Sequence, residues 1–329
     1  MVLTRSSGDR RAELVFLLTA FTAAYYVCEL RFLLADPFFG PELFAQVAHH
    51  AGPKPWQYRV LIPYTADLLS YLNLPLFHSL ERWARLAELS SLFLLVLTFR
   101  RYISLFIRDK VVASLSSFLI LVILPFNFFF PRPHYPNYWY DTPSVLFFTL
   151  GLIFLVQKKW LPYYVVFTIA TFNRETTCFL TVIYLLTSVG RVRPKRIAVH
   201  CVSQLVVWLA IKSLLVKLYA GNPGPSFEWY EQPGVTHFAD NISFFTHLEN
   251  YPMFLSSMGF TWVAVLLHFR RIKVEFVKRS LLVVFPFFVG MMLVANIYEL
   301  RLFAELIPVV LTAFVLVFYE LLQDHASPC

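Results

Sequence analysis

The chain has 329 residues, of which 58% are hydrophobic, and its mean hydropathy is +0.62. Apolar runs of near-spanning length recur from residue 13 to about residue 323, and no soluble core of ordinary size could bury them all. The formal net charge of +8 would suit a nucleic-acid-binding protein, but the Lys and Arg residues lie in short loops between apolar runs rather than along one face. The composition therefore predicts one integral membrane domain over residues 1–329 and argues against a nucleic-acid partner.

Five discrete basic clusters determine the predicted topology. They are Arg5/Arg10/Arg11, Arg100/Arg101/Arg108/Lys110, Lys158/Lys159, Arg191/Arg193/Lys195/Arg196 and Arg270/Arg271/Lys273/Lys278/Arg279. Because cytoplasmic loops carry the excess of Lys and Arg, all five are assigned to the cytoplasm, and an even number of crossings must separate neighbouring clusters. Residues 1–13 then form a cytoplasmic tail. The first apolar run is predicted to be a retained span, because it contains Glu29 and Arg31 and lacks a small-residue cleavage site.

The same pattern predicts an all-α bundle of about nine or ten spanning or half-spanning segments. In chain order these segments occupy about 14–35, 84–99, 111–130, 142–157, 198–219, 251–269, 281–298 and 303–322, together with a stretch from 160 to 190 that goes out and returns. Since that stretch is short for two crossings, its polar middle, Asn173 to Thr177, is expected at the outer tip of two short or re-entrant helices.

Two long segments are predicted to lie outside. Residues 36–83 form the first extracytoplasmic loop, and residues 221–250 form a second, polar one. In the first loop, PELFAQVAHHAG and YRVLIPYTADLLSYLNLPLFHSL are predicted to be amphipathic helices on the membrane surface, the second interrupted by Pro63 and Pro75. Most acidic residues then fall on the outer half, an observation that is independent of the cations used to assign the topology.

Ionisable residues at membrane depth are costly, so each is a candidate for function. The predicted substrate-binding residues are Arg59, Asp141, Arg174, Glu175, Glu299 and Arg301. Arg174 and Glu175 lie in the middle of an otherwise apolar hairpin, where the guanidinium could neutralise a phosphate and the carboxylate could orient it. The alternative is an internal ion pair that closes the turn. Asp141-Thr142-Pro143 also has the pattern of a helix cap, which gives Asp141 a second interpretation.

Two carboxylates of the first outer loop are the catalytic candidates. Asp36 directly follows the first span, and Glu42 opens the first outer helix. A carboxylate held just above the lipid surface could act as a general base on an acceptor hydroxyl. The alternatives are a capping role for Asp36, which precedes Pro37, and a helix-dipole role for Glu42. We predict one functional base in this loop, with Asp36 ahead of Glu42.

Other chemistries have no visible basis in the sequence. His49 and His50 are adjacent, so a helix turns them to different faces, and no HExxH spacing exists; no metal ligands are predicted. The chain has 10 glycines and no GxSxG, and its 4 cysteines show neither disulfide nor metal spacing. Asn241-Ile242-Ser243 fits the glycosylation sequon, which matters only in a eukaryotic secretory membrane.

The layout resembles the GT-C class of multi-spanning glycosyltransferases, which use polyprenyl-phosphate-linked sugars. The shared features are a cytoplasmic amino terminus, one span, a long first outer loop with surface helices, and a bundle of further spans. The stretch ADPFFGPELFAQVAHHAGPKPWQYRVLIPYTADLL is similar to the first loop of that class, and FNRETT and YELRLFAELIP are similar to segments of uncharacterised bacterial membrane proteins. The resemblance implies a catalytic carboxylate at Asp36 or Glu42, although the chain lacks the Asp-Glu pair common in such loops.

The resemblance also implies the reaction, an inverting transfer of a hexosyl or pentosyl unit to an extracytoplasmic glycan, lipid or protein. The donor phosphate is expected near Arg59, Arg174 or Arg301, and an arginine or a divalent cation would offset the charge on the leaving phosphate. Membrane lipids and the lipid-phosphate-linked sugar donor are the expected partners, and the bacterial inner membrane is favoured over the endoplasmic reticulum. Two alternatives stay open: a multi-pass transporter or lipid flippase, for which a broken helix at residues 173–177 would be suitable, and a non-catalytic subunit of an envelope-glycan assembly.

Overall fold

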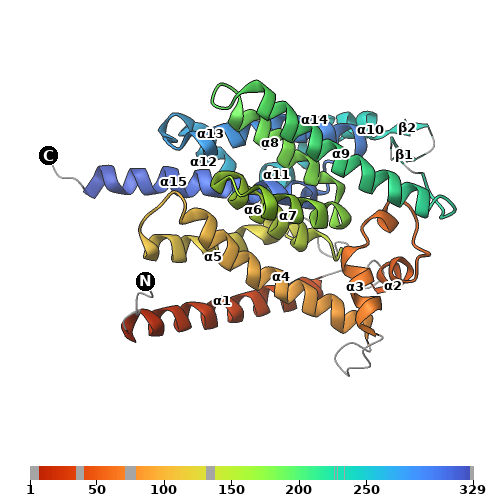
Figure 1. Ribbon diagram of the computed structural model, residues 1–329, viewed down its shortest axis with the longest axis horizontal. Coiled ribbons are helices and arrows are strands. Elements are labelled where there is room, and N and C mark those ends of the chain that lie inside the picture. The colour runs from red at the N-terminus through yellow and green to blue at the C-terminus, as the bar shows by residue number, and fades with distance from the viewer. Residues whose placement is uncertain are drawn as a thin grey trace.

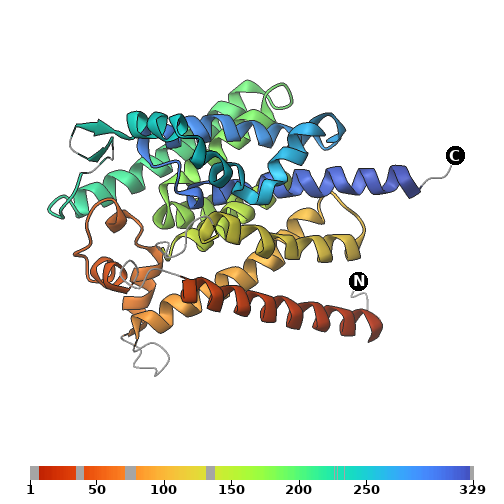
Figure 2. The same cartoon turned by 180° about the vertical axis from the view of Figure 1, so that it is seen from behind.

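The computed structural model describes residues 7–34, 41–70, 79–130, 138–225, 227, 229–232 and 234–326. Most of these residues are helical, and Figures 1 and 2 show the long helices side by side, with both chain termini at the same end of the molecule. Within the described ranges, five helices are long and apolar enough to cross a membrane: Asp9–Leu34, Lys110–Phe128, Pro194–Leu218, Glu275–Val294 and Leu300–Asp324. The predicted all-helical, multi-pass class is confirmed, and shorter apolar helices fill the bundle between these five.

The first half of the chain is arranged around α4 (Leu80–Ile103), which packs against α1 (Ser7–Leu34), α5 (Lys110–Phe128) and α6 (Asp141–Gln157). Small side chains four residues apart, Ala20, Ala24 and Cys28, form the buried face of α1. Because residues at this spacing share one helix face, they let α1 lie close to its neighbours. The opposite face of α1 carries exposed leucine and aromatic side chains, as expected of a helix against lipid.

Two short helices cover the end of α4 that lies far from the termini. They are α2 (Pro41–Ala48) and α3 (Leu61–Ser70), with the 3-10 turn η1 (Trp56–Tyr58) between them. The predicted helices of the first outer loop are therefore present. Pro63 does not interrupt α3, because it is the third residue of that helix, where the backbone N–H has no intrahelical partner. Pro75 lies outside the described residues.

The stretch that was expected to go out and return does reverse its direction. It consists of α7 (Trp160–Asn173), the 3-10 turn η3 (Glu175–Cys178) and α8 (Phe179–Ser188), all packed against α9 (Pro194–Leu218). The ring centroids of Trp160, at the start of α7, and Tyr184, late in α8, are 5.2 Å apart, so α7 and α8 run antiparallel. At 1.5 Å per residue α7 is about 21 Å long, shorter than a hydrocarbon core of about 30 Å.

The second half of the chain contains shorter elements, and the segment at 221–250 is more ordered than a polar loop. Its elements are β1 (Tyr230–Gln232), β2 (Val235–Thr236), α10 (His237–Thr246), η4 (Leu248–Asn250), α11 (Tyr251–Leu255), η5 (Ser257–Phe260), α12 (Thr261–Leu267), η6 (Phe269–Arg271), α13 (Glu275–Ser280), η7 (Leu281–Val283), α14 (Val284–Val294), η8 (Leu300–Leu306) and α15 (Ile307–Ala326). The two strands pair antiparallel as a small hairpin, which the sequence did not predict. The buried α15 packs against α5, α6 and α12.

The segment at about 251–269, predicted to be a span, is not one continuous helix. Met258, Gly259 and Phe260 have φ of 54°, 57° and 59°, so the backbone is left-handed there and the helix is broken. Asn127 of α5 stabilises the break, because its side-chain oxygen accepts a hydrogen bond from the Met258 backbone N–H at 2.9 Å. A Cβ on Gly259 would lie 2.8 Å from Ile123, so this position also needs the small glycine.

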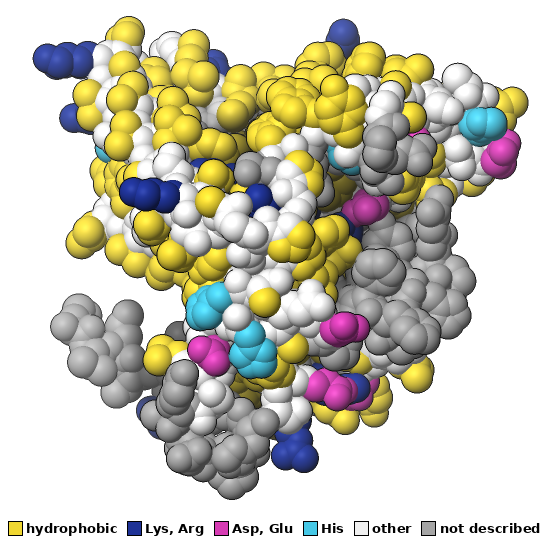
Figure 3. Space-filling model, turned by 90° about the vertical axis from the view of Figure 1, so that its right-hand side faces the viewer, with side chains coloured by type: hydrophobic (Ala, Val, Ile, Leu, Met, Phe, Trp, Pro, Cys, Tyr) yellow, Lys and Arg dark blue, Asp and Glu magenta, His cyan; other side chains and the backbone are white. Residues whose placement is uncertain are grey.

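Ion pairs connect the basic clusters at the end that holds the termini. Arg100 pairs with Glu13 at 2.8 Å, Arg191 with Glu275 at 3.6 Å, and Arg271 with Asp324 at 2.8 Å. The opposite end carries α2, α3 and the β hairpin (Figure 1), and Figure 3 shows acidic and histidine side chains on the surface there together with several Lys and Arg side chains. The bundle therefore separates its basic loops from the loops predicted to lie outside, and which end faces the cytoplasm stays a prediction.

Candidate functional site

A buried carboxylate, Asp141, is the centre of an ionic network at the end of the bundle far from the termini. It is the first residue of α6 and is 0% exposed. Its Oδ1 lies 3.4 Å from a guanidinium nitrogen of Arg174 and 3.4 Å from one of Arg301, and its Oδ2 lies 3.6 Å from Arg31. Three cations from α1, from the residue after α7 and from η8 therefore surround one anion.

The network extends from Asp141 in two directions. On one side, Glu88 of α4 pairs with Arg31 at 2.7 Å and accepts a hydrogen bond from the Thr142 hydroxyl at 2.7 Å. On the other side, Glu305 of η8 lies 3.6 Å from Arg174 and accepts a hydrogen bond from the Thr176 hydroxyl at 2.6 Å. All of these side chains are buried. They form the floor of the network and join α1, α4, α6, η3 and η8.

Two tyrosines that precede α6 contribute aromatic faces to the same place. The Tyr138 and Tyr140 rings stack with centroids 5.2 Å apart. The Arg301 guanidinium lies 4.2 Å from the Tyr138 ring centroid, and the Arg59 guanidinium lies 4.3 Å from that of Tyr140. The Tyr140 hydroxyl accepts a hydrogen bond from Arg59. Because a guanidinium is attracted to the face of an aromatic ring, these two rings help to orient Arg301 and Arg59.

Arg59, Glu175 and Glu299 form a more accessible edge of the network, which we call the rim. Their side chains are 12%, 27% and 27% exposed, respectively. Arg59 pairs with Glu175 at 3.2 Å, and Glu299 pairs with Arg301. Burial by itself would lower the pKa of Arg59, but the Glu175 carboxylate and the Tyr140 hydroxyl raise it above its usual range, so this guanidinium stays charged.

Some polar atoms of the network have no hydrogen-bond partner among the described residues. They are Nε of Arg59 and Arg301, one carboxylate oxygen each of Asp141, Glu175 and Glu305, and Oδ1 of Asn173. Buried polar groups are nearly always hydrogen-bonded, so an unpaired one in a native protein calls for a functional or structural reason. At the rim, the unpaired atoms are Nε of Arg59 and one carboxylate oxygen of Glu175, and both atoms are themselves buried.

The charges of the network balance closely. Its cations are Arg31, Arg59, Arg174 and Arg301, its anions are Glu88, Asp141, Glu175, Glu299 and Glu305, and Lys212 of α9 acts electrostatically on Glu175. Each buried charge thus has a partner of opposite sign, as a low-dielectric interior requires. An added phosphate would have to compete with a carboxylate for its guanidinium. Such competition costs least at the rim, where water already reaches the ion pairs.

The structure brings together all six residues that the sequence predicted for substrate binding. Arg59, Asp141, Arg174, Glu175, Glu299 and Arg301 belong to this one network although they come from separate segments of the chain. The catalytic candidates fare differently. Glu42 is exposed in the first turn of α2, where Gln46 donates to it at 3.5 Å, and Asp36 lies outside the described residues. Their predicted roles stay predictions.

Three members of the network were not predicted as site residues: Arg31, Glu88 and Glu305. Arg31 and Glu88 are charges inside apolar runs, and that signal is the one that singled out Arg174. The two are far apart in the sequence, so only the packing of α1 against α4 reveals the pair. Glu305 lies beside the last apolar run of the sequence, and the structure buries it to 1% exposure.

The sequon asparagine is not accessible in the folded chain. Asn241 is 0% exposed, and its amide nitrogen donates to the backbone oxygens of Met292 at 3.1 Å and Ala295 at 2.7 Å. Its oxygen accepts a hydrogen bond from the Ile297 backbone N–H at 3.0 Å. Asn241 therefore caps the end of α14 instead of presenting an acceptor amide.

Within the described part of the chain, no group of three or more His, Cys, Asp and Glu side chains could hold a metal ion. Comparison of the chain with protein-family models, with curated proteins and with solved structures gave no match.

Proposed function

We propose that the chain is a membrane glycosyltransferase that moves a sugar from a polyprenyl-phosphate donor to an extracytoplasmic acceptor. The observation that carries the proposal is the buried ionic network with its rim of Arg59, Glu175 and Glu299, which lies beside the short helices α2 and α3. The multi-pass helical bundle and the two helices of the first loop agree with a GT-C-like arrangement. A donor with a lipid tail and a charged head suits a polar site at the end of an apolar bundle.

The residues take distinct parts in this proposal. Arg59 of the rim binds the donor phosphate together with Arg301, which pairs with Glu299 of the rim. Glu175 and Glu299 accept hydrogen bonds from sugar hydroxyls. The floor around Asp141 holds the rim in place, and Arg174 acts through that floor because its side chain is 2% exposed. A base from the first loop, Asp36 ahead of Glu42, removes the proton of the acceptor hydroxyl while the acceptor oxygen bonds to the anomeric carbon and the sugar–phosphate bond breaks. The leaving phosphate keeps its charge beside the two guanidinium groups.

A transporter or lipid flippase is the second candidate, and the helix break at Met258, Gly259 and Phe260 favours it. Broken helices near the middle of a bundle form ion and substrate sites in many transporters. Here, however, Asn127 and Ser257 occupy the polar groups at the break, and the charged residues gather at one end of the bundle. A path across the whole membrane would need polar groups along its length.

Sugar transfer by purified protein in lipid nanodiscs tests the proposal. The donors are a panel of polyprenyl-phosphate hexoses and pentoses with a radiolabelled sugar, offered with glycan and lipid acceptors. We expect transfer by the unaltered chain, and Arg59→Ala should lower it by about a hundredfold, mainly through a higher KM for the donor, because a charged hydrogen-bond donor to the phosphate is lost. Arg59→Lys should recover only part of the activity, since a point charge replaces a planar fork.

The matched control is Arg85→Ala. Arg85 lies near the start of α4, at the end of that helix covered by α2 and α3. Its side chain is 40% exposed and forms ion pairs with Glu29 and Glu81. This variant should keep full transfer. Absence of transfer from every donor, or equal losses in the Arg59 and Arg85 variants, would contradict the proposal.

A further inference from the structure

A pocket of about 970 Å³ lies at the other end of the bundle, between the first half of α1, the end of α4 and the start of α5. Val15, Val111 and Leu115 line it and are 63%, 65% and 66% exposed, so the pocket opens sideways onto the apolar surface of the bundle. Phe16 and Phe118 meet edge to face inside it, with ring centroids 5.4 Å apart. In a membrane protein such an opening faces lipid.

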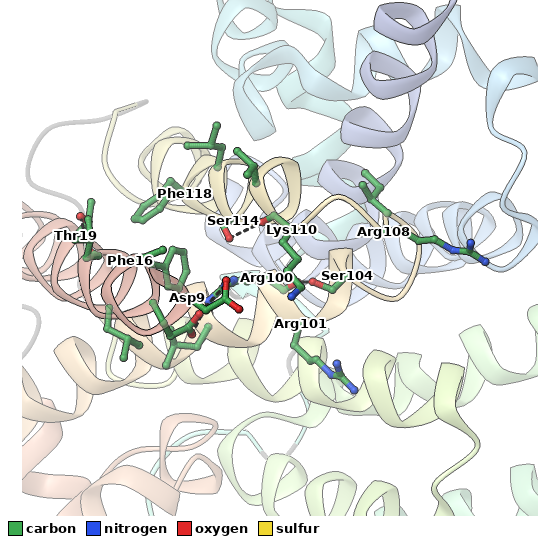
Figure 4. Close-up of a pocket in the computed structure, with 18 residues that line it drawn as sticks. Asp9, Phe16, Thr19, Arg100, Arg101, Ser104, Arg108, Lys110, Ser114 and Phe118 are labelled. Atoms are coloured by element: carbon green, nitrogen blue, oxygen red, sulfur yellow. Dashed lines mark hydrogen bonds and ion pairs between the residues drawn. The ribbon is translucent and has the colours of Figure 1, made fainter. Parts of the chain in front are cut away.

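The lining of this pocket is charged at one end and apolar at the other. Its four cations, Arg100, Arg101, Arg108 and Lys110, come from the end of α4, the start of α5 and the turn between them, and its two carboxylates, Asp9 and Glu13, come from α1. Arg100 is already neutralised, because Glu13 pairs with it at 2.8 and 3.0 Å. Arg101, Arg108 and Lys110 have no carboxylate at ion-pair distance among the described residues. In Figure 4, Lys110 extends toward Arg100 between the helices, whereas Arg101 and Arg108 extend outward at the edge.

The pocket has the depth of one lipid leaflet. From Asp9 to Thr19 along α1 the rise is about 15 Å, and from Lys110 to Phe118 along α5 it is about 12 Å. Half of a hydrocarbon core of about 30 Å is about 15 Å. When the cations lie at headgroup depth, the apolar end therefore reaches along the acyl chains of the same leaflet.

We propose that this pocket binds one phospholipid with an anionic headgroup. The phosphate pairs with Lys110, the side chains of Arg101 and Arg108 are long enough to reach it from the edge, and an acyl chain lies over Leu115 and Phe118. A zwitterionic lipid would bring its ammonium group beside these cations, so the excess of four cations over two carboxylates in the lining selects an anionic lipid. This inference does not depend on the proposed function, because the pocket lies at the opposite end of the bundle from the ionic network.

Native mass spectrometry of the detergent-purified protein, with phosphatidylglycerol and phosphatidylcholine of identical chains in competition, tests the proposal. The unaltered chain should bind phosphatidylglycerol preferentially. Lys110→Gln should weaken phosphatidylglycerol binding by about fivefold, the effect expected of one cation near a lipid headgroup. It should weaken phosphatidylcholine binding less, because the ammonium group of that lipid already offsets the charge of its phosphate. Ser114→Trp fills the pocket and should remove the bound lipid of either kind. If that variant unfolds, Leu115→Trp at the exposed edge of the pocket replaces it in the same test, with the same expected loss of lipid.

Lys195→Gln is the matched control, because Lys195 is exposed in the first turn of α9, carries the same charge and belongs to another basic cluster. It should leave the lipid preference unchanged. Free glycerol 3-phosphate should not displace the lipid, since the pocket holds an acyl chain as well as a phosphate. Equal binding of the two lipids, an equal loss in the Lys110 and Lys195 variants, or displacement by glycerol phosphate would each overturn the proposal.

Discussion

At the scale of the residue, the position of Asp141 explains how several charges persist in a membrane bundle. Its carboxylate lies at the amino-terminal, electropositive end of α6 and within 3.6 Å of three guanidinium groups. Each arginine in turn contacts a second carboxylate: Glu88 for Arg31, Glu305 for Arg174 and Glu299 for Arg301. Breaking one pair leaves an uncompensated buried charge, which costs more than the pair contributed.

We therefore expect Asp141→Asn to destabilise the protein by about 3–5 kcal/mol, the usual cost of removing one partner from a buried ion pair. The measurement is reversible unfolding in mixed detergent micelles. Glu81→Gln is the control, because Glu81 is 56% exposed in a surface pair with Arg85 and should change stability by less than about 1 kcal/mol. Equal stability of the two variants would show that Asp141 does not organise the network.

A second prediction at this scale concerns the base. Replacing a carboxylate by its amide keeps its size but removes proton acceptance, so Asp36→Asn should lower the proposed sugar transfer by roughly a hundredfold with donor binding retained. Glu42→Gln should have a milder effect, since Glu42 has a ready role in the first turn of α2. Steady-state kinetics of both variants gives the comparison, and full activity in both would remove the base from this loop.

At the scale of the element, the break between α11 and α12 depends on one amide from another helix. Asn127 donates to the Ser257 hydroxyl at 3.3 Å and to the Leu300 backbone oxygen at 2.8 Å, while it accepts from the Met258 N–H at 2.9 Å. The side chain is 1% exposed, so no bulk water replaces these partners. One residue thus joins α5, η5 and η8 where the backbone lacks its own helical hydrogen bonds.

Asn127→Leu should open this junction, because it leaves a backbone donor and a backbone acceptor buried without partners, at about 1–3 kcal/mol each. Hydrogen–deuterium exchange should become faster in peptides that cover residues 257–261 and change little in α9. The control is Asn250→Ala, which removes a single bond to the Phe244 backbone oxygen and should leave the break protected. Unchanged exchange at 257–261 in the Asn127→Leu variant would show that packing alone holds the break.

At the scale of the whole molecule, the bundle has two chemically different ends. At the end that carries both termini, basic residues pair with carboxylates of neighbouring helices: Arg100 with Glu13, Arg191 with Glu275 and Arg271 with Asp324. The ionic network and the short helices α2 and α3 lie at the other end. A charge distribution of this kind orients a membrane protein, because Lys and Arg are retained in the cytoplasm during insertion.

The predicted orientation can be checked by cysteine labelling in a chain whose own cysteines are replaced. His49, after α2, and Lys195, in α9, are exposed and lie in segments assigned to opposite sides. A membrane-impermeant maleimide should label His49→Cys in intact cells and Lys195→Cys only after permeabilisation. Labelling of both sites in intact cells would reject the topology. Labelling of Lys195→Cys in intact cells and of His49→Cys only after permeabilisation would show that the orientation is inverted.

Sequence alone was enough to predict the class of the protein and much of the candidate site. Apolar runs with charged loops specify a helical membrane bundle, since lipid leaves the backbone no other partners than its own. The prediction that Arg59, Asp141, Arg174 and Arg301 belong to one site followed from the cost of placing charge in or beside lipid. The reversal at Asn173 to Thr177 followed from the length of the stretch between two basic clusters.

Which charges meet and which helices break depends instead on tertiary packing. Arg31 and Glu88 are 57 residues apart, and their pairing follows from the packing of α1 on α4, which no local pattern encodes. The left-handed residues at 258–260 arise because Asn127, 131 positions from Met258, supplies the missing hydrogen bond. Tertiary packing also decides the role of Asn241. Its hydrogen bonds to Ala295 and Ile297, more than 50 residues away, bury the side chain that the local sequon pattern would have placed at the surface.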